Sequence, residues 1–249
     1  MPFVTGLKQK LYLKTVPYHR PLPIENIERK QEGKRNGMRQ EYVQKVLDWL
    51  VDTYGMHNDG FYHNHPWQHL VAIMLSAQST DKQVDEVLPA LYARFDTVED
   101  VAEANAEEIE YYIRSIGIYK NKAKNMKKCC TQLSREYGGV VPSTREELMK
   151  LSGIGRKTAN LYMANELGIP EITVDTHVHR VSNRLGWVNS KNVLQTEKQL
   201  QVVLPKKYWI PINILLIRHG RALCKARKPE CDRCFLNKYC EYYKNRDNS

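Results

Sequence analysis

The apolar positions of this 249-residue chain recur mostly at intervals of three and four residues, the spacing of one buried face of an α-helix. Few stretches alternate between apolar and polar residues in the manner of β-strands. The clearest helical stripe begins after Met38 and consists of Val43, Val46, Leu47, Leu50, Val51 and Tyr54. The pattern therefore predicts an all-α protein.

Further helices are predicted along the rest of the chain. Thr80 and Gln83 form a capping box ahead of one of them, and Pro89 should kink or divide that helix. In chain order, the predicted helices cover residues 67–75, 81–95, 98–102, 106–116, a stretch that ends at 136, a short segment from 142, a stretch that ends near 167, another after 175, then 191–204 and 207–223.

Residues 1–37 depart from this pattern. They show no sustained hydrophobic period, include four prolines and end in a charged run. Residues 1–40 contain nine Lys or Arg against three Glu, and therefore carry +6 of the formal net charge of +10. We expect a loose basic arm, with Met38 as a second candidate for the natural first residue.

The charge and hydropathy of the chain narrow its class. A net charge of +10 and a pI of about 9.2 indicate a polyanionic partner. The chain after the arm contributes only +4, so a basic face on this part requires that its Lys and Arg residues cluster on one side. No apolar run approaches the roughly 20 residues that a membrane helix needs, and no secretory signal is recognisable. We expect a cytoplasmic protein, associated with the nucleoid if it is bacterial.

The stretch 147–182 contains the candidate chemistry. In LSGIGRKTAN, Gly153 and Gly155 permit positive φ and allow backbone N–H groups to approach another molecule closely. Lys157 follows in the first helical turn, where the helix dipole favours a neutral amine, and Asp175 lies in the next loop. Spacing alone also allows a purely structural interpretation, in which the glycines form an ordinary loop, the lysine is solvated and the aspartate only caps a helix.

Four cysteines with the spacing C-x6-C-x2-C-x5-C lie near the C-terminus. In a reducing compartment such a cluster favours metal ligation over disulfides. Both zinc and an iron-sulfur cluster accept four thiolates, and the single C-x2-C pair favours iron-sulfur. Cys129 and Cys130 lie in a helical pattern and are expected to be packed thiols. The four candidate ligands are Cys224, Cys231, Cys234 and Cys240.

Taken together, LSAQSTD, LSGIGRKTAN, VDTHVHRV and the four cysteines make residues 38–243 resemble the endonuclease III family of helix-hairpin-helix DNA glycosylases. The resemblance implies two all-α lobes with DNA bound between them. A six-helix barrel-like lobe would comprise residues 57–169, and the other lobe would join residues 38–56 to 170–249. It also implies a 4Fe-4S cluster on the four cysteines.

The resemblance also implies roles for individual residues. Lys157 matches the family's nucleophile and Asp175 its catalytic aspartate, while Gly153, Gly155 and Arg156 of the hairpin would hold a DNA phosphate. Such an enzyme extrudes the damaged base, and a carboxylate stabilises the positive charge that develops on the sugar. An amine that attacks C1′ forms a Schiff base, and β-elimination then cleaves the strand.

Five further residues are assigned to DNA contact by the same resemblance. Gln78 would fill the space left by the extruded nucleotide, although a loop glutamine is normally only solvent-exposed. Ile118 occupies the second wedge position, which is typically leucine, and this departure affects the predicted lesion preference. Lys225, Arg227 and Lys228 would form a basic loop against phosphates, with a solvated loop as the alternative.

The predicted function is thus a bifunctional glycosylase and abasic-site lyase that removes oxidised pyrimidines from damaged double-stranded DNA. We expect a monomer without a nucleotide cofactor or membrane contact. A monofunctional mismatch glycosylase would replace Lys157 with a residue that is not an amine. A non-enzymatic helix-hairpin-helix DNA-binding module would need neither Lys157 nor Asp175, and an iron-sulfur electron carrier would need only the cysteines.

Overall fold

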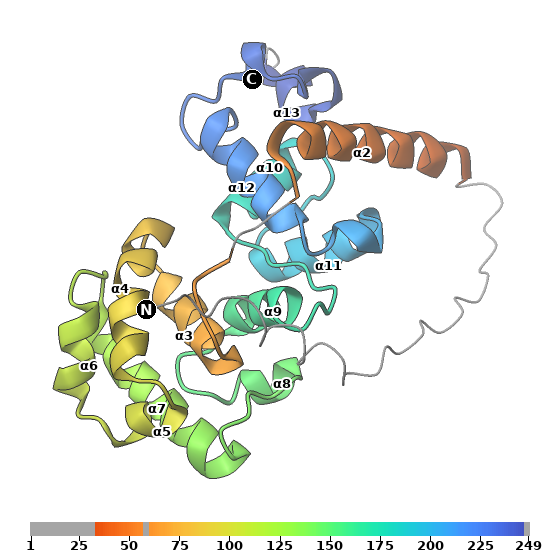
Figure 1. Ribbon diagram of the computed structural model, residues 1–249. Helices are drawn as coiled ribbons and strands as arrows, with labels where there is room; N and C mark the ends of the chain where they lie inside the picture. Colours follow the sequence, from red (N-terminus) through yellow and green to blue (C-terminus); the bar gives the residue numbers. More distant parts are fainter. Residues whose placement is uncertain (1–32, 57–59, 247–249) are drawn as a thin grey trace, which may run out of the picture. The chain divides into compact units, whose positions relative to one another are not determined.

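The computed structural model describes residues 33–56 and 60–246, and within these ranges every regular element is a helix (Figure 1). The all-α prediction is therefore confirmed. The chain divides into two units, residues 1–38 and 39–249, and the second contains every candidate site residue. Most of the predicted arm, residues 1–32, lies outside the described part.

The helices follow one another without strands between them in the described part. The α-helices are α2 (Gly33–Tyr54), α3 (Pro66–Ser76), α4 (Asp81–Arg94), α5 (Val98–Glu103), α6 (Ala106–Ile113), α7 (Tyr119–Tyr137), α8 (Arg145–Leu148), α9 (Arg156–Asn165), α10 (Thr176–Arg184), α11 (Val193–Val203), α12 (Ile212–Ala222) and α13 (Glu241–Lys244). Three short 3-10 helices are η1 (Lys206–Tyr208), η2 (Cys231–Arg233) and η3 (Asn237–Tyr239).

Local sequence signals account for several of these helix ends. Thr80 and Gln83 form the predicted capping box of α4, with the backbone N–H of Gln83 donating to the Thr80 hydroxyl over 3.2 Å. Asp175 caps α10 as its position suggested. The helix through Pro89 is not divided, because this proline is exposed and the backbone carbonyl that it leaves unpaired can bond to water.

Other boundaries were predicted wrongly, each for a local reason. The helix expected from residue 142 begins at Arg145, because the side chain of Thr144 caps it. The helix expected at 207–223 is split into η1 and α12, since Pro211 lacks the N–H that would continue one helix through this point. The first helix begins at Gly33, ahead of Met38 and within the predicted arm.

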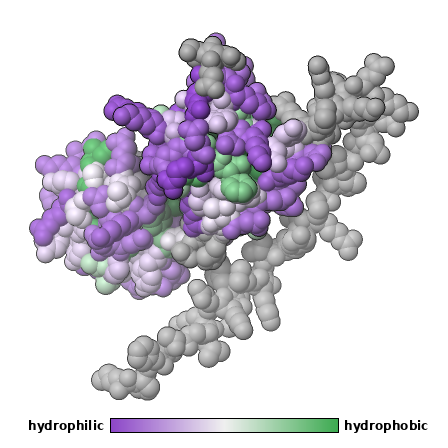
Figure 2. All heavy atoms as spheres, turned by 90° about the horizontal axis from the view of Figure 1, so that it is seen from above, coloured by the Kyte–Doolittle hydropathy of each residue, from purple (hydrophilic) through white to green (hydrophobic). Residues whose placement is uncertain are grey.

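Two hydrophobic cores organise residues 39–246. One is built from α3 to α9, with α5 and α6 packing on α7, and α3 packing on α4 and α9. The other is built from α2, the segment 172–174, α10, α11 and α12, with α10 packing on α11 and α12. Hydrophilic residues cover most of the face seen in Figure 2, as expected when the apolar stripes are turned inward. Within the described part, no helix is both long and apolar enough to cross a membrane.

Candidate active site

The hairpin between α8 and α9 is a tight turn that only glycine can complete. Gly153 has φ of 79°, and a Cβ placed there would lie 2.8 Å from the Cβ of Asn125 and 3.1 Å from the sulfur of Met74. Gly155 is the N-cap of α9 with φ of −91°, so this glycine does not use the positive φ that its residue type permits. A Cβ at Gly155 would meet nothing within 4 Å, and this open space leaves the first turn of α9 accessible to an anion.

Lys157 lies in this first turn and its side chain is exposed. No described residue forms a hydrogen bond or an ion pair with its amine. The first turn of α9 contains no acidic residue, and its N-cap offers no side-chain hydrogen bond. The amine is therefore free to meet a substrate beside unpaired backbone N–H groups.

Asp175 caps the next helix with one carboxylate oxygen. Its Oδ1 accepts hydrogen bonds from the backbone N–H groups of His177 and Val178, both over 2.8 Å. Among the described residues, none donates a hydrogen bond to Oδ2. The cap thus holds the carboxylate in a fixed orientation while one oxygen remains available to a ligand.

His177 connects the surroundings of Lys157 and Asp175. Burial lowers the pKa of His177, the negative charge of Asp175 raises it, and the positive charges of Arg180, Arg221 and Lys157 lower it further. The lysine and the aspartate are therefore close enough to act on one imidazole. The sequence pattern did not single out His177, although it lies within the VDTHVHRV motif.

A buried polar network joins α9 to the loop that precedes Asp175. The Asn160 amide, which is 1% exposed, donates to the backbone carbonyl of Ile172 over 3.1 Å and to Oε2 of Glu197 over 3.2 Å. Glu197 lies on α11 and is 4% exposed. The network fixes the helix that carries Lys157 relative to the segment that leads to Asp175.

Arg156 takes part in the same network. Its Nη2 donates to Oε1 of Glu197 over 2.6 Å, and its Nε donates to Oε2 over 3.0 Å. The guanidinium was predicted to contact DNA, and two of its nitrogens are paired with a buried carboxylate, which leaves Nη1. Nearby, Arg145 forms an ion pair with Glu171 and donates to the Asn160 amide oxygen over 2.7 Å. Such partners, 41 residues apart for Arg156 and Glu197, cannot be found from local spacing.

The two predicted wedge residues lie on adjoining loops with the same unusual backbone. Gln78 has φ of 55° and Ile118 has φ of 53°, a region that a β-branched residue rarely adopts. A Cβ at Gly117 would lie 3.1 Å from the carbonyl oxygen of Gln78. Both wedge side chains are exposed. Exposed residues held in strained backbone are typical of functional sites.

Lys122 of α7 supports the loop that carries Gln78. Its buried amine donates to the carbonyl of Leu75 over 2.8 Å and to the Ser79 hydroxyl over 2.7 Å. Burial lowers the pKa of Lys122. The sequence gives no signal for this role, because a lysine in a helical pattern is usually solvated.

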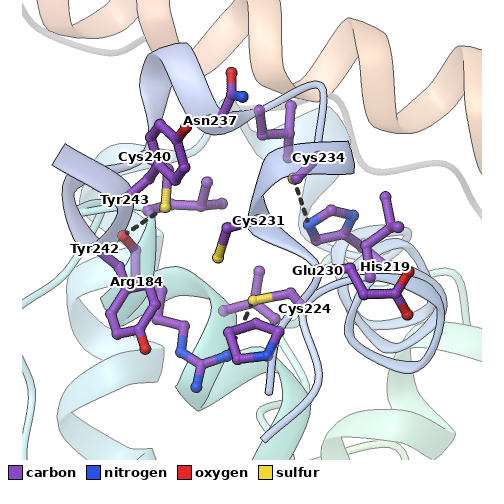
Figure 3. A pocket seen from close by; sticks show the side chains of 15 residues that line it. Arg184, His219, Cys224, Glu230, Cys231, Cys234, Asn237, Cys240, Tyr242 and Tyr243 are labelled. Carbon is purple, nitrogen blue, oxygen red and sulfur yellow. Dashed lines mark hydrogen bonds between the residues drawn. The ribbon is translucent and has the colours of Figure 1, made fainter. Parts of the chain in front are cut away.

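The four candidate cysteine ligands line one cavity (Figure 3). Apolar side chains complete its wall, among them Val181, Leu185 and Leu236. Burial raises the pKa of the Cys234 thiol to about 11 and also raises that of Cys231 and Cys240, so the free thiols are neutral. Four converging sulfurs in an apolar wall fit an all-thiolate iron-sulfur cluster.

Arg184 and His219 lie next to the sulfur atoms of three of these cysteines. Arg184 Nη1 donates to the sulfur of Cys224 over 3.3 Å, and the backbone carbonyl of Arg184 lies 3.2 Å from the sulfur of Cys240. His219 lies 3.7 Å from the sulfur of Cys234, and burial lowers the pKa of this histidine to about 4. When bound, the cluster supplies a fixed centre for the loop between Cys224 and Cys240.

The predicted basic loop is anchored by Arg184 as well. The guanidinium donates to the carbonyl of Lys225 over 2.7 Å and to that of Ala226 over 3.0 Å. The Lys225 amine is paired with Glu230 over 2.6 Å, which leaves Arg227 and Lys228 as exposed positive charges on this loop. Lys228 has φ of 49°, the third non-glycine residue in left-handed backbone in the described part.

Comparison with known proteins decides the family. Residues 71–206 match the HhH-GPD superfamily of base excision DNA repair proteins, and residues 224–240 match the iron-sulfur binding domain of endonuclease III. Endonuclease III of Bacillus subtilis is 41% identical over 208 residues, which cover 82% of this chain and 94% of that protein. This chain belongs to the endonuclease III family.

Other members agree with this assignment. Endonuclease III of Escherichia coli K12 is 41% identical over 177 residues, covering 71% of this chain and 84% of that protein. A trapped endonuclease III–DNA covalent intermediate matches with a TM-score of 0.77 at 41% identity, covering 84% of this chain and 98% of that one. A non-covalent endonuclease III–DNA complex also gives 0.77, at 40% identity and 84% and 99% coverage.

The predicted family, fold and iron-sulfur cofactor are therefore confirmed. As a member of the endonuclease III family, the protein is a base-excision DNA glycosylase with abasic-site lyase activity, and DNA is its partner. The iron-sulfur match covers residues 224–240, which include all four cysteines of the cavity.

Proposed function

We propose that this protein removes oxidised pyrimidines from duplex DNA and cleaves the resulting strand through a Schiff base on Lys157. The observation that carries this proposal is the placement of Lys157 and Asp175 in two successive helix N-termini. An exposed, unpaired amine lies at one of them and a half-buried carboxylate at the other. Their common influence on His177 supports their assignment to one site.

The chemistry uses Lys157 as the nucleophile. The lone pair of Nζ attacks C1′ of the extruded nucleotide, the bond to the base breaks, and the base leaves with the electron pair of that bond. Opening of the sugar yields an imine between Nζ and C1′. Loss of a proton from C2′ then expels the 3′ phosphate, and water releases the amine. A neutral amine is required, and an ordinary lysine with pKa of about 10.4 is neutral about once in a few thousand molecules at pH 7.

Asp175 would stabilise the charge on the sugar. Its Oδ1 is occupied by two backbone N–H groups, so we assign the interaction with the substrate to Oδ2. A carboxylate fixed by a helix cap needs little reorganisation when positive charge develops, which is the condition for effective electrostatic catalysis. The cap and the catalytic role are therefore compatible in one residue.

The DNA backbone would be held by the hairpin and by the basic loop. Gly153 and Gly155 shape a turn whose N–H groups face an open space suited to a phosphate. Arg156 contributes its remaining nitrogen, Nη1, because Nε and Nη2 are paired with Glu197. From the loop around the cluster, Lys225, Arg227 and Lys228 would add sequence-independent attraction to phosphates.

Gln78 and Ile118 would occupy the duplex where the nucleotide leaves it. Their loops adjoin at Gly117, both side chains are exposed, and both residues have left-handed backbone. The Ile118 side chain is restricted at χ1, and we expect this stiffness to affect which lesions the enzyme prefers. The two hydrophobic cores support the proposed division into lobes 57–169 and 38–56 with 170–249, between which DNA would bind.

We further propose that the protein acts as a monomer in the cytoplasm, at the nucleoid in a bacterium, without a nucleotide cofactor. Light scattering during gel filtration tests the first point: a mass near 29.1 kDa supports a monomer, and a doubled mass contradicts it.

A panel of duplexes, each with a single lesion, tests the proposed reaction. Base release and strand scission are measured separately, with undamaged and abasic duplexes as references. We expect both products from oxidised pyrimidines and scission alone from the abasic duplex. Base release without scission would indicate a monofunctional glycosylase. Binding without either product would indicate a DNA-binding module, and neither binding nor products would leave only the electron carrier.

A further inference from the structure

A second cluster of ligating side chains lies away from Lys157 and the cysteines. His63 precedes α3, His69 lies on α3, and Glu166 is the C-cap of α9. The Oε2 of Glu166 is 2.6 Å from Nδ1 of His69 and 3.3 Å from Nε2 of His63. One ligating atom from each residue lies within 4.8 Å of the others. Neither the proposed chemistry nor the DNA contacts use this cluster.

The hydrogen bonds of His63 leave one ring nitrogen directed at the carboxylate. Its Nδ1 is 2.6 Å from the carbonyl oxygen of Phe61, and a carbonyl only accepts, so Nδ1 carries the proton. In the neutral ring Nε2 is then an acceptor that faces another acceptor, Oε2 of Glu166. Either a second proton on the ring or a metal cation between these atoms resolves this conflict. A ligating histidine that donates its other N–H to a backbone carbonyl is the usual arrangement around a protein-bound metal.

The other two residues also favour a cation. His69 is 3% exposed, and its Nδ1 faces Oε2 of Glu166, so packing holds this nitrogen beside the carboxylate. Glu166 adds a negative charge at the C-terminus of α9, where the helix dipole is already negative.

We propose that His63, His69 and Glu166 bind one divalent transition-metal ion of the zinc class. Two imidazoles and one carboxylate form a ligand set that zinc accepts, with a water molecule in the fourth position. The two rings are stacked with 4.3 Å between their centroids, and a metal ion must lie near the plane of each ring. The His63 side chain is 28% exposed, which gives it room for the required tilt.

The ion would position the helix that carries the nucleophile. It joins the segment before α3 to the C-terminal end of α9, whereas Lys157 lies in the first turn of this ten-residue helix. At 1.5 Å per residue the two ends of α9 are about 15 Å apart, so the ion does not touch the reacting atoms. The proposed role is to fasten α9, and it stands whether or not Lys157 is the nucleophile.

Zinc binding by the protein with its iron-sulfur cluster intact tests this site. Each variant is incubated with zinc chloride, passed through a desalting column, and analysed for zinc and iron by mass spectrometry. The variants are His63→Gln, Glu166→Gln and, as a matched control, His65→Gln, an exposed histidine two residues from His63 that is not one of the three clustered residues. His69→Gln is left out because a buried substitution can unfold the chain.

We expect about one zinc per chain in the wild type and in the His65 variant. The His63 and Glu166 variants should bind zinc more weakly by at least the roughly 10–100-fold that follows loss of a partner of a metal ligand. At equal iron content, zinc should raise the melting temperature of the wild type and the His65 variant, and should leave that of the His63 and Glu166 variants unchanged. The proposal is overturned if the wild type binds no zinc, because only a proton-linked ion pair would then remain. It is also overturned if the His63 and His65 variants bind equal amounts of zinc.

Discussion

The double use of Asp175 leads to a prediction that separates capping from catalysis. Asp175→Asn keeps an oxygen that can accept hydrogen bonds from the N–H groups of His177 and Val178, and removes only the negative charge. Asparagine and aspartate cap helices about equally well. Asp175→Ala removes both the cap and the charge. The two variants should therefore differ in stability and agree in activity.

The expected magnitudes follow from these contacts. Loss of the cap in Asp175→Ala should cost about 1 kcal/mol, within a range of roughly 0.5–2 kcal/mol. For a chain of this size that is a decrease in melting temperature of about 2–4 °C. Asp175→Asn should melt within about 1 °C of the wild type, on the same basis. Removing a preorganised charge from the transition state should lower the rate of base excision by about 100–1000-fold in both variants.

Thermal unfolding by circular dichroism and single-turnover base release on a lesion duplex provide the two readouts. Asn192→Ala is the matched control, because Asn192 caps α11 through a 3.0 Å bond from the N–H of Gln195. This control should lose a similar stability and retain its activity. If Asp175→Asn keeps base excision within a few-fold of the wild type, Asp175 is only a cap and the catalytic assignment is wrong.

Three further outcomes are expected. Glu197→Ala removes the partner of Arg156; the side chain of Glu197 is 5% exposed and that of Arg156 is 38% exposed. Breaking a fully buried pair costs roughly 3–5 kcal/mol of stability. Because water reaches the guanidinium here, we expect a smaller loss of about 2–3 kcal/mol for this variant. Its melting temperature should fall by about 4–12 °C, and an unchanged value would contradict the described network. Gln78→Ala should slow processing of a lesion in paired duplex more than of a single-stranded abasic site; equal losses would argue against a wedge. Cys231→Ser should lower the iron content below about four per chain and weaken DNA binding, and full iron occupancy would remove Cys231 from the ligands.

Features that depend on neighbouring residues could be predicted from the sequence. The capping box of Thr80 and the cap by Asp175 are local hydrogen bonds, and the stripe from Val43 to Tyr54 reflects one helical face. The four cysteines were found because their spacing brings the thiols together within seventeen residues. In each case a short segment contains all the atoms that determine the structure.

Features that depend on distant partners could not be predicted. Glu197 pairs with Arg156 and Asn160 across about forty residues, and nothing in the local pattern around it distinguishes it from a solvated glutamate. The same holds for Lys122, whose amine reaches back 47 residues to the carbonyl of Leu75. Residue type shows that Gly155 can adopt a positive φ, but it does not show that its backbone has φ of −91° beside open space.

Trapping of the Schiff base tests the central assignment most directly. Wild-type protein is mixed with an abasic duplex in the presence of borohydride, alongside Lys157→Ala and, as control, Lys198→Ala, which removes an exposed lysine from α11. We predict a covalent protein–DNA adduct with the wild type and the Lys198 variant, and none with the Lys157 variant, while all three bind the duplex. An adduct that forms at the full rate in the Lys157 variant would assign the nucleophile to another amine and contradict the proposed mechanism.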